Sequence, residues 1–517
     1  MAIKTLIRPS EYHDSVSLML VARELARLPG VSDAAVVMAT EANKGILREA
    51  GLLTPEAEAA STNDLVIAIN ATAEAMAPAM AEAEKLLQQK QAVTESVEFR
   101  PRTLRSAIRA RPDANVAVIS VAGRYAADQA WEALHQGLHV LLFSDNVSLA
   151  DEIALKKYAS ENGLLLMGPG AGTAILNGVA LGFANVIPPG PVGIVSAAGT
   201  GLQEVSTLLA KYGSGITQGI GTGGRDLSEE VGGKMMLAGL QALQQDPATQ
   251  VILLVSKPPA ESVARLVVEA AARGGKPTVI CFLGGPKEAL AGRDNIYPAA
   301  TLEEAAIQAA RLAGASPADT ALQAEFDEAH LNELCSRLRP NQRYLRGLFS
   351  GGTLCYEAQV IWKELMPRPV YSNAPLSPAY KLPDSNRSQQ DTAVDLGEEE
   401  FTVGRLHPMI DNELRIRRLL QEARDAEVAV IMLDVVLGYG AHPNPAAELA
   451  PAVRKARQLA SEAGGELIVV ASVTGTEQDP QRLSSQVEAM QLAGVLVCAS
   501  NASAARLTAS IINRIGA

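Results

Sequence analysis

Two short turns rich in glycine carry residue types suited to holding phosphate. The first, AAGTG at residues 197–201, follows an apolar run at 192–195 and precedes a helical pattern of leucines and valines. Glycines let the backbone approach a ligand, and the first free N–H groups of the helix point into the turn, which favours an anion. Gly199, Thr200 and Gly201 are therefore candidate phosphate ligands.

The chain repeats this design at residues 344–358, YLRGLFSGGTLCYEA. An apolar strand, a small-residue turn and a helix again follow one another. A glutamate stands four residues after the threonine in both copies, Glu204 and Glu357. An internal repeat of this size predicts two similar domains facing each other, with both turns converging on one site. The candidate ligands of the second turn are Gly351, Gly352 and Thr353.

The elements that must position these turns are strands alternating with helices from about residue 101 onward. This alternation predicts an α/β fold of several parallel-sheet domains, with ligands at the carboxyl ends of the strands. A small α+β domain is expected before them, and residues 367–390 are expected to form a surface loop. The expected domains are a small α+β unit at 1–100, a Rossmann-like unit at 101–188, a first repeat domain at 189–315, a linker with one helix at 316–340 and a second repeat domain at 341–517.

Composition narrows the class of protein. The 517 residues carry a net charge of −12, which argues against nucleic acid or an anionic membrane as the main partner. The 4 cysteines are far apart and lack metal-ligand spacing, so we expect no metal site and a reduced, cytoplasmic setting. No apolar run approaches the ~20 residues of a membrane span. A dinucleotide fingerprint is missing after the first strand of the 101–188 unit, which argues against NAD or FAD.

The order of motifs resembles the succinyl-CoA synthetase superfamily. MGPG at 167–170 and VGIVSAAGTG at 192–201 are similar to its α subunit, while GLFSGGTLCYEA at 347–358 and VDLG at 394–397 are similar to the carboxyl-terminal domain of its β subunit. The resemblance implies flavodoxin-like repeat domains, a unit of CoA-binding type at 101–188, and coenzyme A as a possible ligand. It also implies that the two turns hold a phosphate between them.

The sequence departs from that superfamily in three places. The segment 283–305, where the phosphorylated histidine of the family should lie, contains no histidine. No counterpart of the nucleotide-binding ATP-grasp domain is present. The glutamate that partners the histidine would fall near Lys257, where no carboxylate stands. The usual ATP-linked relay is therefore not expected.

A more extensive resemblance is to the FdrA family of acyl-CoA synthetase-like proteins. It implies partner subunits and a carbamoyl transfer in which oxalurate and phosphate yield oxamate and carbamoyl phosphate, so that phosphate or carbamoyl phosphate is the expected ligand. Whether the chain also forms a homo-oligomer stays open. The motifs that carry this resemblance are SVSLML at 15–20, MATEANKG at 38–45, SDNVSLADEI at 144–153, GGRDLSEEVGG at 223–233, SKPPAE at 256–261, FTVGRLHPMID at 401–411 and VTGTEQDPQ at 473–481.

Such a transfer needs a phosphate cradle, donors that polarise the carbonyl, and a group that handles a proton. Arg225 and Arg405, each after a glycine in corresponding stretches, could clamp a carboxylate or phosphate, or could form surface salt bridges. His407, in a glycine–proline loop, is the acid/base candidate because imidazole titrates near neutrality; a structural role is the alternative. Lys257 could neutralise phosphate charge or be a solvated lysine.

Weaker candidates have simpler explanations. Asp226 and Asp395 could orient the arginines, but aspartate at such places more often caps a helix. Cys355 is one turn into the second helix, where a thiol pKa falls, yet a small buried residue explains it as well. His442 is a second candidate for proton transfer.

Three functions stay open. The first is a subunit of a carbamoyl or acyl transferase that uses phosphate and a small-molecule substrate without ATP. The second is a subunit of an acyl-CoA ligase whose histidine and nucleotide domain come from another chain. The third is a scaffold subunit without catalytic residues.

Overall fold

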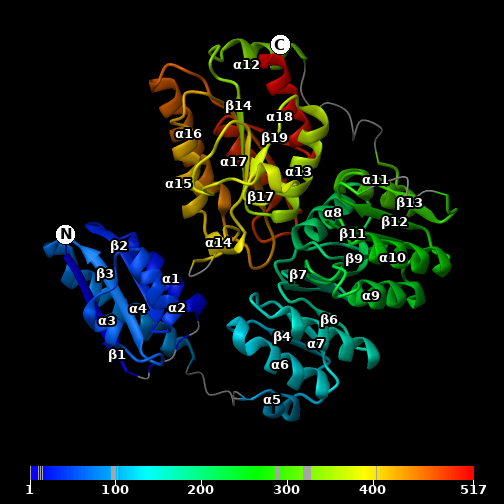
Figure 1. Ribbon diagram of the computed structural model, residues 1–517, viewed down its shortest axis with the longest axis horizontal. Coiled ribbons are helices and arrows are strands. Elements are labelled where there is room, and N and C mark those ends of the chain that lie inside the picture. The colour runs from blue at the N-terminus through cyan, green and yellow to red at the C-terminus, as the bar shows by residue number, and fades with distance from the viewer. Residues whose placement is uncertain are drawn as a thin grey trace. The chain divides into compact units, whose positions relative to one another are not determined.

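The computed structural model shows that the chain divides into two compact units (Figure 1). One comprises Met1–Arg102 with Glu399–Leu406, and the other Thr103–Glu398 with His407–Ala517. The structure describes residues 2–9, 11, 13, 15–94, 101, 103–285, 292–317, 328–402 and 405–516. No helix in these ranges is both long enough and apolar enough to cross a lipid bilayer.

The N-terminal unit is a three-stranded antiparallel sheet of order β1-β3-β2 with helices on both faces. Its central strand β3 (Leu65–Ala71) is apolar except at Asn70, because successive side chains enter two cores. One face packs on α1 and α4, and the other packs on α2 and α3. The other elements are β1 (Ala2–Arg8), α1 (Ser15–Ala26), β2 (Val31–Met38), α2 (Glu41–Glu49), α3 (Pro55–Ala59) and α4 (Ala73–Thr94).

The second unit begins with a three-stranded parallel sheet of order β4-β5-β6. Alanines of α6 and leucines of the strands form its core. Small residues allow helices to pack closely on a sheet. The elements are α5 (Leu104–Ala110), β4 (Val116–Ile119), α6 (Gly123–His135), β5 (His139–Leu142), α7 (Leu149–Glu161) and β6 (Leu166–Met167).

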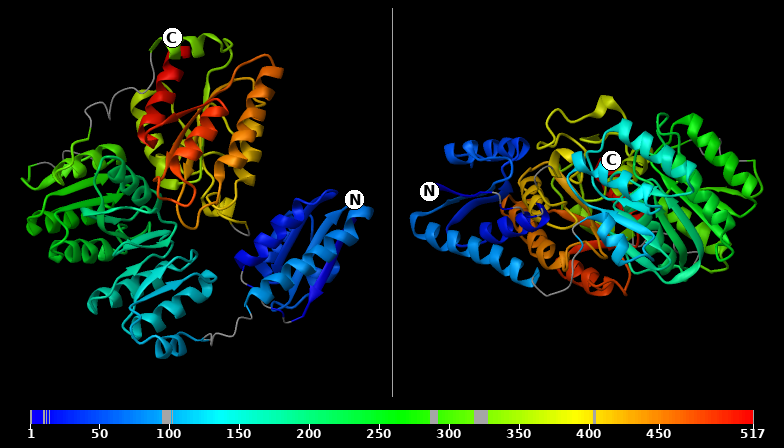
Figure 2. Two further views of the ribbon diagram at one scale, coloured as in Figure 1. Left: turned by 180° about the vertical axis from the view of Figure 1, so that it is seen from behind. Right: turned by 90° about the horizontal axis from the view of Figure 1, so that it is seen from below.

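The first repeat builds a seven-stranded sheet of order β13-β12-β11-β9-β10-β7-β8. Strands β9 to β13 are parallel, while the hairpin β7–β8 adds an antiparallel edge. Helices cover both faces (Figures 1 and 2). The elements are β7 (Thr173–Leu176), β8 (Val179–Gly182), β9 (Pro189–Ser196), α8 (Gly199–Lys211), β10 (Ile216–Gly221), α9 (Lys234–Gln245), β11 (Val251–Ser256), α10 (Glu261–Gly274), β12 (Thr278–Phe282), β13 (Ile296–Pro298) and α11 (Leu302–Leu312).

The second repeat builds a six-stranded parallel sheet of order β15-β16-β14-β17-β18-β19. The α/β class with parallel sheets that the alternation predicts is confirmed. The elements are α12 (Glu328–Ser336), β14 (Tyr344–Phe349), α13 (Gly352–Leu365), β15 (Tyr371–Ser372), a 3-10 turn (Pro378–Tyr380), β16 (Thr392–Asp395), α15 (Glu413–Glu422), β17 (Val428–Val436), α16 (Pro445–Glu462), β18 (Ile468–Thr474), α17 (Leu483–Leu492), β19 (Val495–Cys498) and α18 (Asn501–Gly516), while α14 (Glu399–Thr402) belongs to the N-terminal unit.

Two segments differ from the expectation or fall partly outside the description. The stretch 367–390, expected as a surface loop, contributes the edge strand β15, because Tyr371 and Ser372 pair with β16. Its Asn373 is also 3% exposed and bonded to the end of β16. The expected linker at 316–340 contains α12, and its residues 318–327 lie outside the described ranges.

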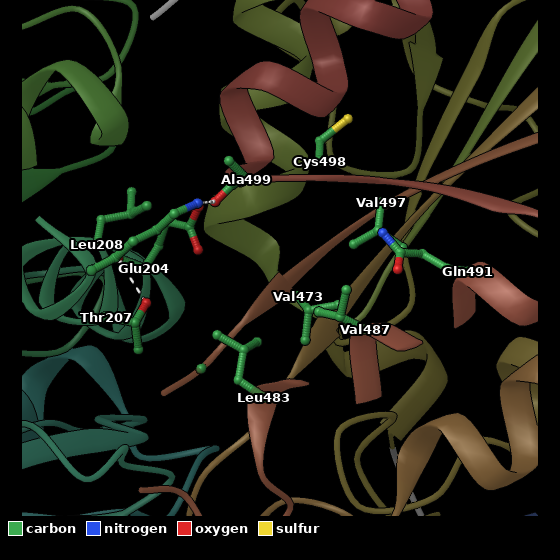
Figure 3. Close-up of a pocket in the computed structure, with 12 residues that line it drawn as sticks. Glu204, Thr207, Leu208, Val473, Leu483, Val487, Gln491, Val497, Cys498 and Ala499 are labelled. Atoms are coloured by element: carbon green, nitrogen blue, oxygen red, sulfur yellow. Dashed lines mark hydrogen bonds between the residues drawn. The ribbon is translucent and has the colours of Figure 1, made fainter. Parts of the chain in front are cut away.

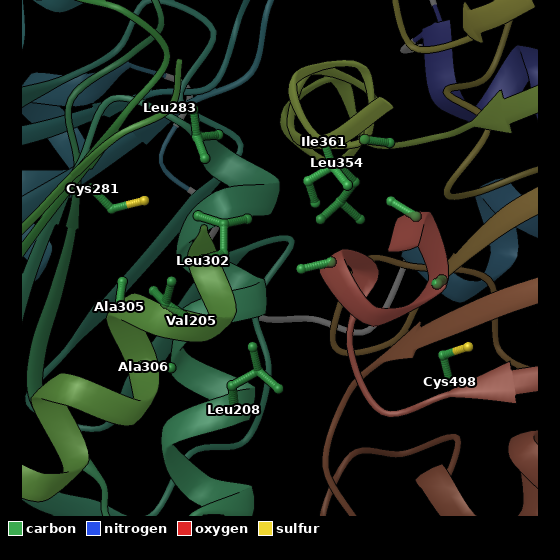
Figure 4. Packing of buried hydrophobic residues seen from close by; sticks show 14 of the residues in the cluster. Val205, Leu208, Cys281, Leu283, Leu302, Ala305, Ala306, Leu354, Ile361 and Cys498 are labelled. Carbon is green, nitrogen blue, oxygen red and sulfur yellow. The ribbon is translucent and has the colours of Figure 1, made fainter. Parts of the chain in front are cut away.

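One apolar core joins the two repeats (Figure 4). Val205 and Leu208 on α8 pack with Leu302 at the start of α11, and the same cluster includes Leu354 and Ile361 on α13. Both repeats lie within one compact unit, and burying each such side chain contributes about 1.5–3 kcal/mol to its packing. This packing brings α8 close to α13.

Candidate functional site

The two glycine turns meet at the boundary between the repeats. The Thr353 N–H donates a hydrogen bond to Thr200 Oγ1 at 3.3 Å. A β-carbon built on Gly351 would lie 2.9 Å from Thr200 Cγ2, and one on Gly201 would lie 3.0 Å from Thr353 Cγ2. The N-termini of α8 and α13 therefore face each other with their threonines in contact, as the expected convergence of the turns requires.

The second turn is fixed by a carboxylate from the neighbouring strand β17. Asp434 accepts hydrogen bonds from the N–H groups of Ser350 and Gly351, both at 2.7 Å, and from the Ser350 hydroxyl at 3.0 Å. Arg415 forms an ion pair with Asp434 at 3.1 Å. The first turn is closed locally, since the Ala198 N–H donates to Ser196 Oγ at 3.1 Å. Both turns are thus held before any ligand binds.

A lysine of the first repeat lies against the turn of the second. Lys257 directly follows β11, and its Nζ would be 3.6 Å from a β-carbon on Gly352. The same ammonium group lies 5.7 Å from the centroid of the Tyr356 ring. Lys257 therefore adds a positive charge beside a helix N-terminus that already favours anions.

Asp395 ends β16 and faces the same turn. Its Oδ2 would be 2.5 Å from a β-carbon on Gly352, so only glycine allows this approach. Its Oδ1 accepts a hydrogen bond from the Gly397 N–H at 3.0 Å. Burial raises the pKa of Asp395 to about 7, against the opposing effect of Lys257. This carboxyl is therefore present in both protonation states near neutral pH.

His407 lies beside Gly397, the residue whose N–H donates to Asp395. Its Nδ1 accepts the Met409 N–H at 3.2 Å, and its ring packs on Phe183 with centroids 5.6 Å apart. A β-carbon on Gly397 would be 2.9 Å from Nε2. Burial, and then the charge of Arg415, lower the pKa of His407 to about 4. The expectation that this imidazole titrates near neutrality is therefore wrong: it is neutral at pH 7, and with Nδ1 accepting, Nε2 carries the hydrogen.

The two arginines have other surroundings. Arg225 Nε pairs with Glu152 at 2.7 Å, and its Nη2 donates to the Val147 carbonyl at 2.8 Å. Its contacts therefore come from α7 and the loop before it. Arg405 is exposed and lies in the segment Glu399–Leu406 of the N-terminal unit. A substrate-binding role for either arginine stays a prediction.

The adjacent aspartate Asp226 has a structural environment. It accepts the Met236 N–H at 2.8 Å at the start of α9 and a hydrogen bond from Lys156 Nζ at 2.9 Å.

Gly199 is the first residue of α8, and a β-carbon on it would be 3.6 Å from Thr173 Oγ1. This first turn is less crowded than the second.

Two further candidates are engaged elsewhere. Burial raises the pKa of the Cys355 thiol well above its usual value, and the nearby Asp395 carboxylate adds to this. The thiolate that a nucleophile needs is therefore disfavoured. His442 Nε2 lies 3.3 Å from Glu448 Oε2, and its Nδ1 accepts the Asn444 N–H at 3.1 Å just before α16.

Three family models match the chain. Residues 348–511 match a CoA-ligase model, residues 189–284 match a CoA binding domain, and residues 1–101 match a model described as AllF, heavy metal-associated domain. The uncharacterized protein YahF of Escherichia coli strain K12 is 45% identical over 513 residues, which cover 99% of each chain. The chain belongs to the YahF family. Its CoA-ligase and CoA-binding domains place it in the succinyl-CoA synthetase-like superfamily.

More distant relatives of this YahF family member match only parts of the chain. The alpha subunit of the ADP-forming succinate–CoA ligase of Methanothermobacter thermautotrophicus is 28% identical over 148 residues, covering 28% of this chain and 49% of that subunit. Among solved structures, the dinucleotide-forming acetyl-coenzyme A synthetase 1 of Ca. Korarchaeum cryptofilum is 15% identical, covers 78% of this chain and 83% of its own, and has a TM-score of 0.32.

Sequence reasoning missed a cluster of buried carboxyl groups next to the turns of this YahF family member. Glu204, Glu303 and Glu357 are each at most 2% exposed. Burial raises the pKa of Glu357 to about 8 and also raises that of Glu204, and the charge of the nearby Glu303 adds to both shifts. The sequence feature that could have indicated this cluster is the equal spacing of Glu204 and Glu357 from their threonines. That spacing alone does not show that the repeats bring the two glutamates together.

A pocket of about 390 Å³ runs along α8, starting at Glu204 (Figure 3). Glu204, Thr207 and Leu208 line it from α8, while the carboxyl ends of β18 and β19 face them. The pocket lies beside the later turns of α8, whereas Thr200 is in the first. Within the described ranges, no group of three His, Cys, Asp or Glu side chains is placed to hold a metal ion.

Proposed function

We propose that the chain is the phosphate-binding subunit of a carbamoyl or acyl transferase, similar to the FdrA family, in which phosphate attacks the carbonyl of an oxalurate-type ureide and carbamoyl phosphate forms. The observation that carries this proposal is the hydrogen bond between Thr353 N–H and Thr200 Oγ1, which joins the N-termini of α8 and α13. Two helix dipoles and Lys257 then act on one anion.

The chemistry follows from the groups at this boundary. N–H groups at the first turns of α8 and α13 would hold phosphate oxygens, since these donors have no partners within their helices. Lys257 would reduce the charge repulsion as a phosphate oxygen approaches the carbonyl carbon. The chain lacks a histidine at 283–305, so phosphate itself, rather than a phosphorylated side chain, is the nucleophile in this proposal.

A second function is favoured by the family models. The CoA-ligase and CoA-binding matches support a subunit of an acyl-CoA synthetase, with coenzyme A as the ligand. In that case the boundary between the repeats would hold the phosphate of an acyl phosphate, and other chains would supply the nucleotide site. Both functions use the same turns, so the ligand that binds distinguishes them.

Isothermal titration of the full chain with phosphate, carbamoyl phosphate and coenzyme A, each separately, tests the proposal. We expect saturable binding of both phosphates and its loss in Gly352→Val, because a β-carbon there would lie 2.5 Å from Asp395 Oδ2. Gly45→Ala is the matched control, since nothing lies within 4 Å of a β-carbon on Gly45. Binding of coenzyme A without either phosphate favours the synthetase. Binding of none of the three contradicts both functions and favours the scaffold.

A further inference from the structure

We propose that Asp395 is the catalytic residue that carries the proton from the attacking phosphate to the leaving nitrogen. The inference rests on the proposed function, because it assigns a role within the same site. It starts from position: Asp395 is the last residue of β16, an inner strand next to the edge of the parallel sheet, and ligands bind at the carboxyl ends of strands in open α/β sheets.

The carboxyl group is held in one orientation. The Asn373 side chain accepts the Asp395 N–H at 2.9 Å and donates to the Asp395 carbonyl at 2.8 Å. Oδ1 accepts the Gly397 N–H at 3.0 Å. Oδ2 is left facing Gly352, the first residue of α13, in contact range of the turn. A group that must meet a bound phosphate would need this pre-set direction.

The charged and titratable groups around Asp395 come from several elements. Lys257 from the loop after β11 favours its ionised form, whereas Glu398 from the turn after β16 and Asp434 from β17 favour the neutral form. Of the other neighbours, the Cys355 thiol has a pKa raised well above its usual value, and the pKa of His407 is about 4. Neither exchanges a proton readily at pH 7, while Asp395 does, since its pKa is about 7.

The reaction balances without a further reactant. The Asp395 carboxylate takes the proton of hydrogen phosphate while the phosphate oxygen forms a bond to the carbamoyl carbon. It returns that proton to the ureide nitrogen as the C–N bond breaks. An amide nitrogen is a poor leaving group without a proton, whereas a phenolate or thiolate leaves as an anion. Hydrogen phosphate can attack through an ionised oxygen and release its proton to water after a phenolate has left. The need for Asp395 is therefore specific to nitrogen leaving groups.

Comparison of two carbamoyl donors with phosphate as acceptor tests this role. In Asp395→Asn, transfer from oxalurate should fall by about 10²–10⁴-fold, while transfer from 4-nitrophenyl carbamate should fall by less than about tenfold. Asp391→Asn is the control: it removes a buried carboxylate just before the same strand, one that accepts the Leu345 N–H at 2.8 Å. It should change both rates equally. Equal loss for both donors in Asp395→Asn, or no loss, overturns the role.

Phosphate binding gives a second measurement that needs no turnover. At pH 8.5 the wild-type carboxylate repels phosphate, so its Kd should exceed that of Asp395→Asn by about tenfold, while at pH 6 the two should differ by less than about twofold. Phosphate binding with parallel pH profiles overturns the role of Asp395 alone. No phosphate binding at pH 6 by either protein overturns the proposed phosphate site and, with it, this inference.

Discussion

Glu204 and Glu357 each cap the last helix of the opposite repeat. Glu204, on α8, accepts the Asn501 N–H at the start of α18 at 2.9 Å. Glu357, on α13, accepts the Leu302 N–H at the start of α11 at 2.6 Å. Because both glutamates stand four residues after the threonines that meet at the turns, this exchange of caps fixes the two turns relative to each other.

Glu357→Gln should flatten the dependence of stability on pH. Burial raises the pKa of Glu357 to about 8 in the folded protein, whereas an unfolded glutamate titrates near 4.3. The folded state therefore binds more protons between these values, and its stability falls as pH rises through that window. The raised pKa of Glu204 acts in the same direction.

Urea unfolding at pH 5, 7 and 9 measures this effect. The free energy of unfolding of Glu357→Gln should decrease less from pH 5 to pH 9 than that of the wild type. Glu261→Gln, an exposed glutamate on α10, is the control and should keep the wild-type slope. An unchanged slope in Glu357→Gln would show that Glu357 is ionised in the folded protein over this range.

Thr200→Val should weaken phosphate binding without unfolding the chain. Valine keeps the volume of threonine but removes the acceptor of the Thr353 N–H. A hydrogen bond of this kind contributes about 0.5–1.5 kcal/mol, so we expect Kd to rise by about three- to tenfold. Thr207→Val is matched to it, because Thr207 is on the same helix and donates to the Glu204 carbonyl at 3.0 Å. Equal effects of both variants in calorimetry would contradict a role for the turn.

Much of the fold follows from local patterns. The alternation of strands and helices predicts parallel sheets, and β17 (Val428–Val436) is such a strand, buried on both faces and apolar except at Asp434. The repeat predicted that the two turns converge, and the contact of Thr353 with Thr200 agrees. Phosphate binding there stays a prediction.

The rest depends on contacts between residues distant in sequence. The short hairpin β7–β8 pairs with β10, which no periodicity within four-residue strands reveals. Asp395 was interpreted as a helix cap. Its burial beside Lys257 arises only when the repeats pack together, so the local sequence does not show it. The low pKa of His407 likewise comes from burial and from Arg415, and neither can be inferred from a loop sequence.

Lys257→Met should weaken phosphate binding and shift its pH dependence. The ammonium group contributes a charged interaction at the turn, typically about 1.5–3 kcal/mol, so we expect Kd to rise by about tenfold or more. Lys257 lowers the pKa of Asp395, so its loss should move the midpoint of the pH profile upward. Lys211→Met, an exposed lysine at the other end of α8, is the control. A calorimetric profile with an unchanged midpoint would contradict the pairing of Lys257 with Asp395.

His407→Gln should protect the fold against acid without changing the pH profile of the transfer above pH 6. Burial lowers the pKa of His407 to about 4, below the 6.5 of an unfolded histidine. The stability that this depressed pKa contributes is present above pH 6.5 and is lost as pH falls towards 4. Glutamine cannot take up a proton, so this loss disappears.

Urea unfolding of both proteins at pH 4.5 and 7 checks the expectation. The wild type should lose more free energy of unfolding than His407→Gln between these values, while His330→Gln, a histidine on the exposed α12, should behave like the wild type. A midpoint near pH 6.5 in the transfer rate that disappears in His407→Gln would mean that His407, rather than Asp395, handles the proton.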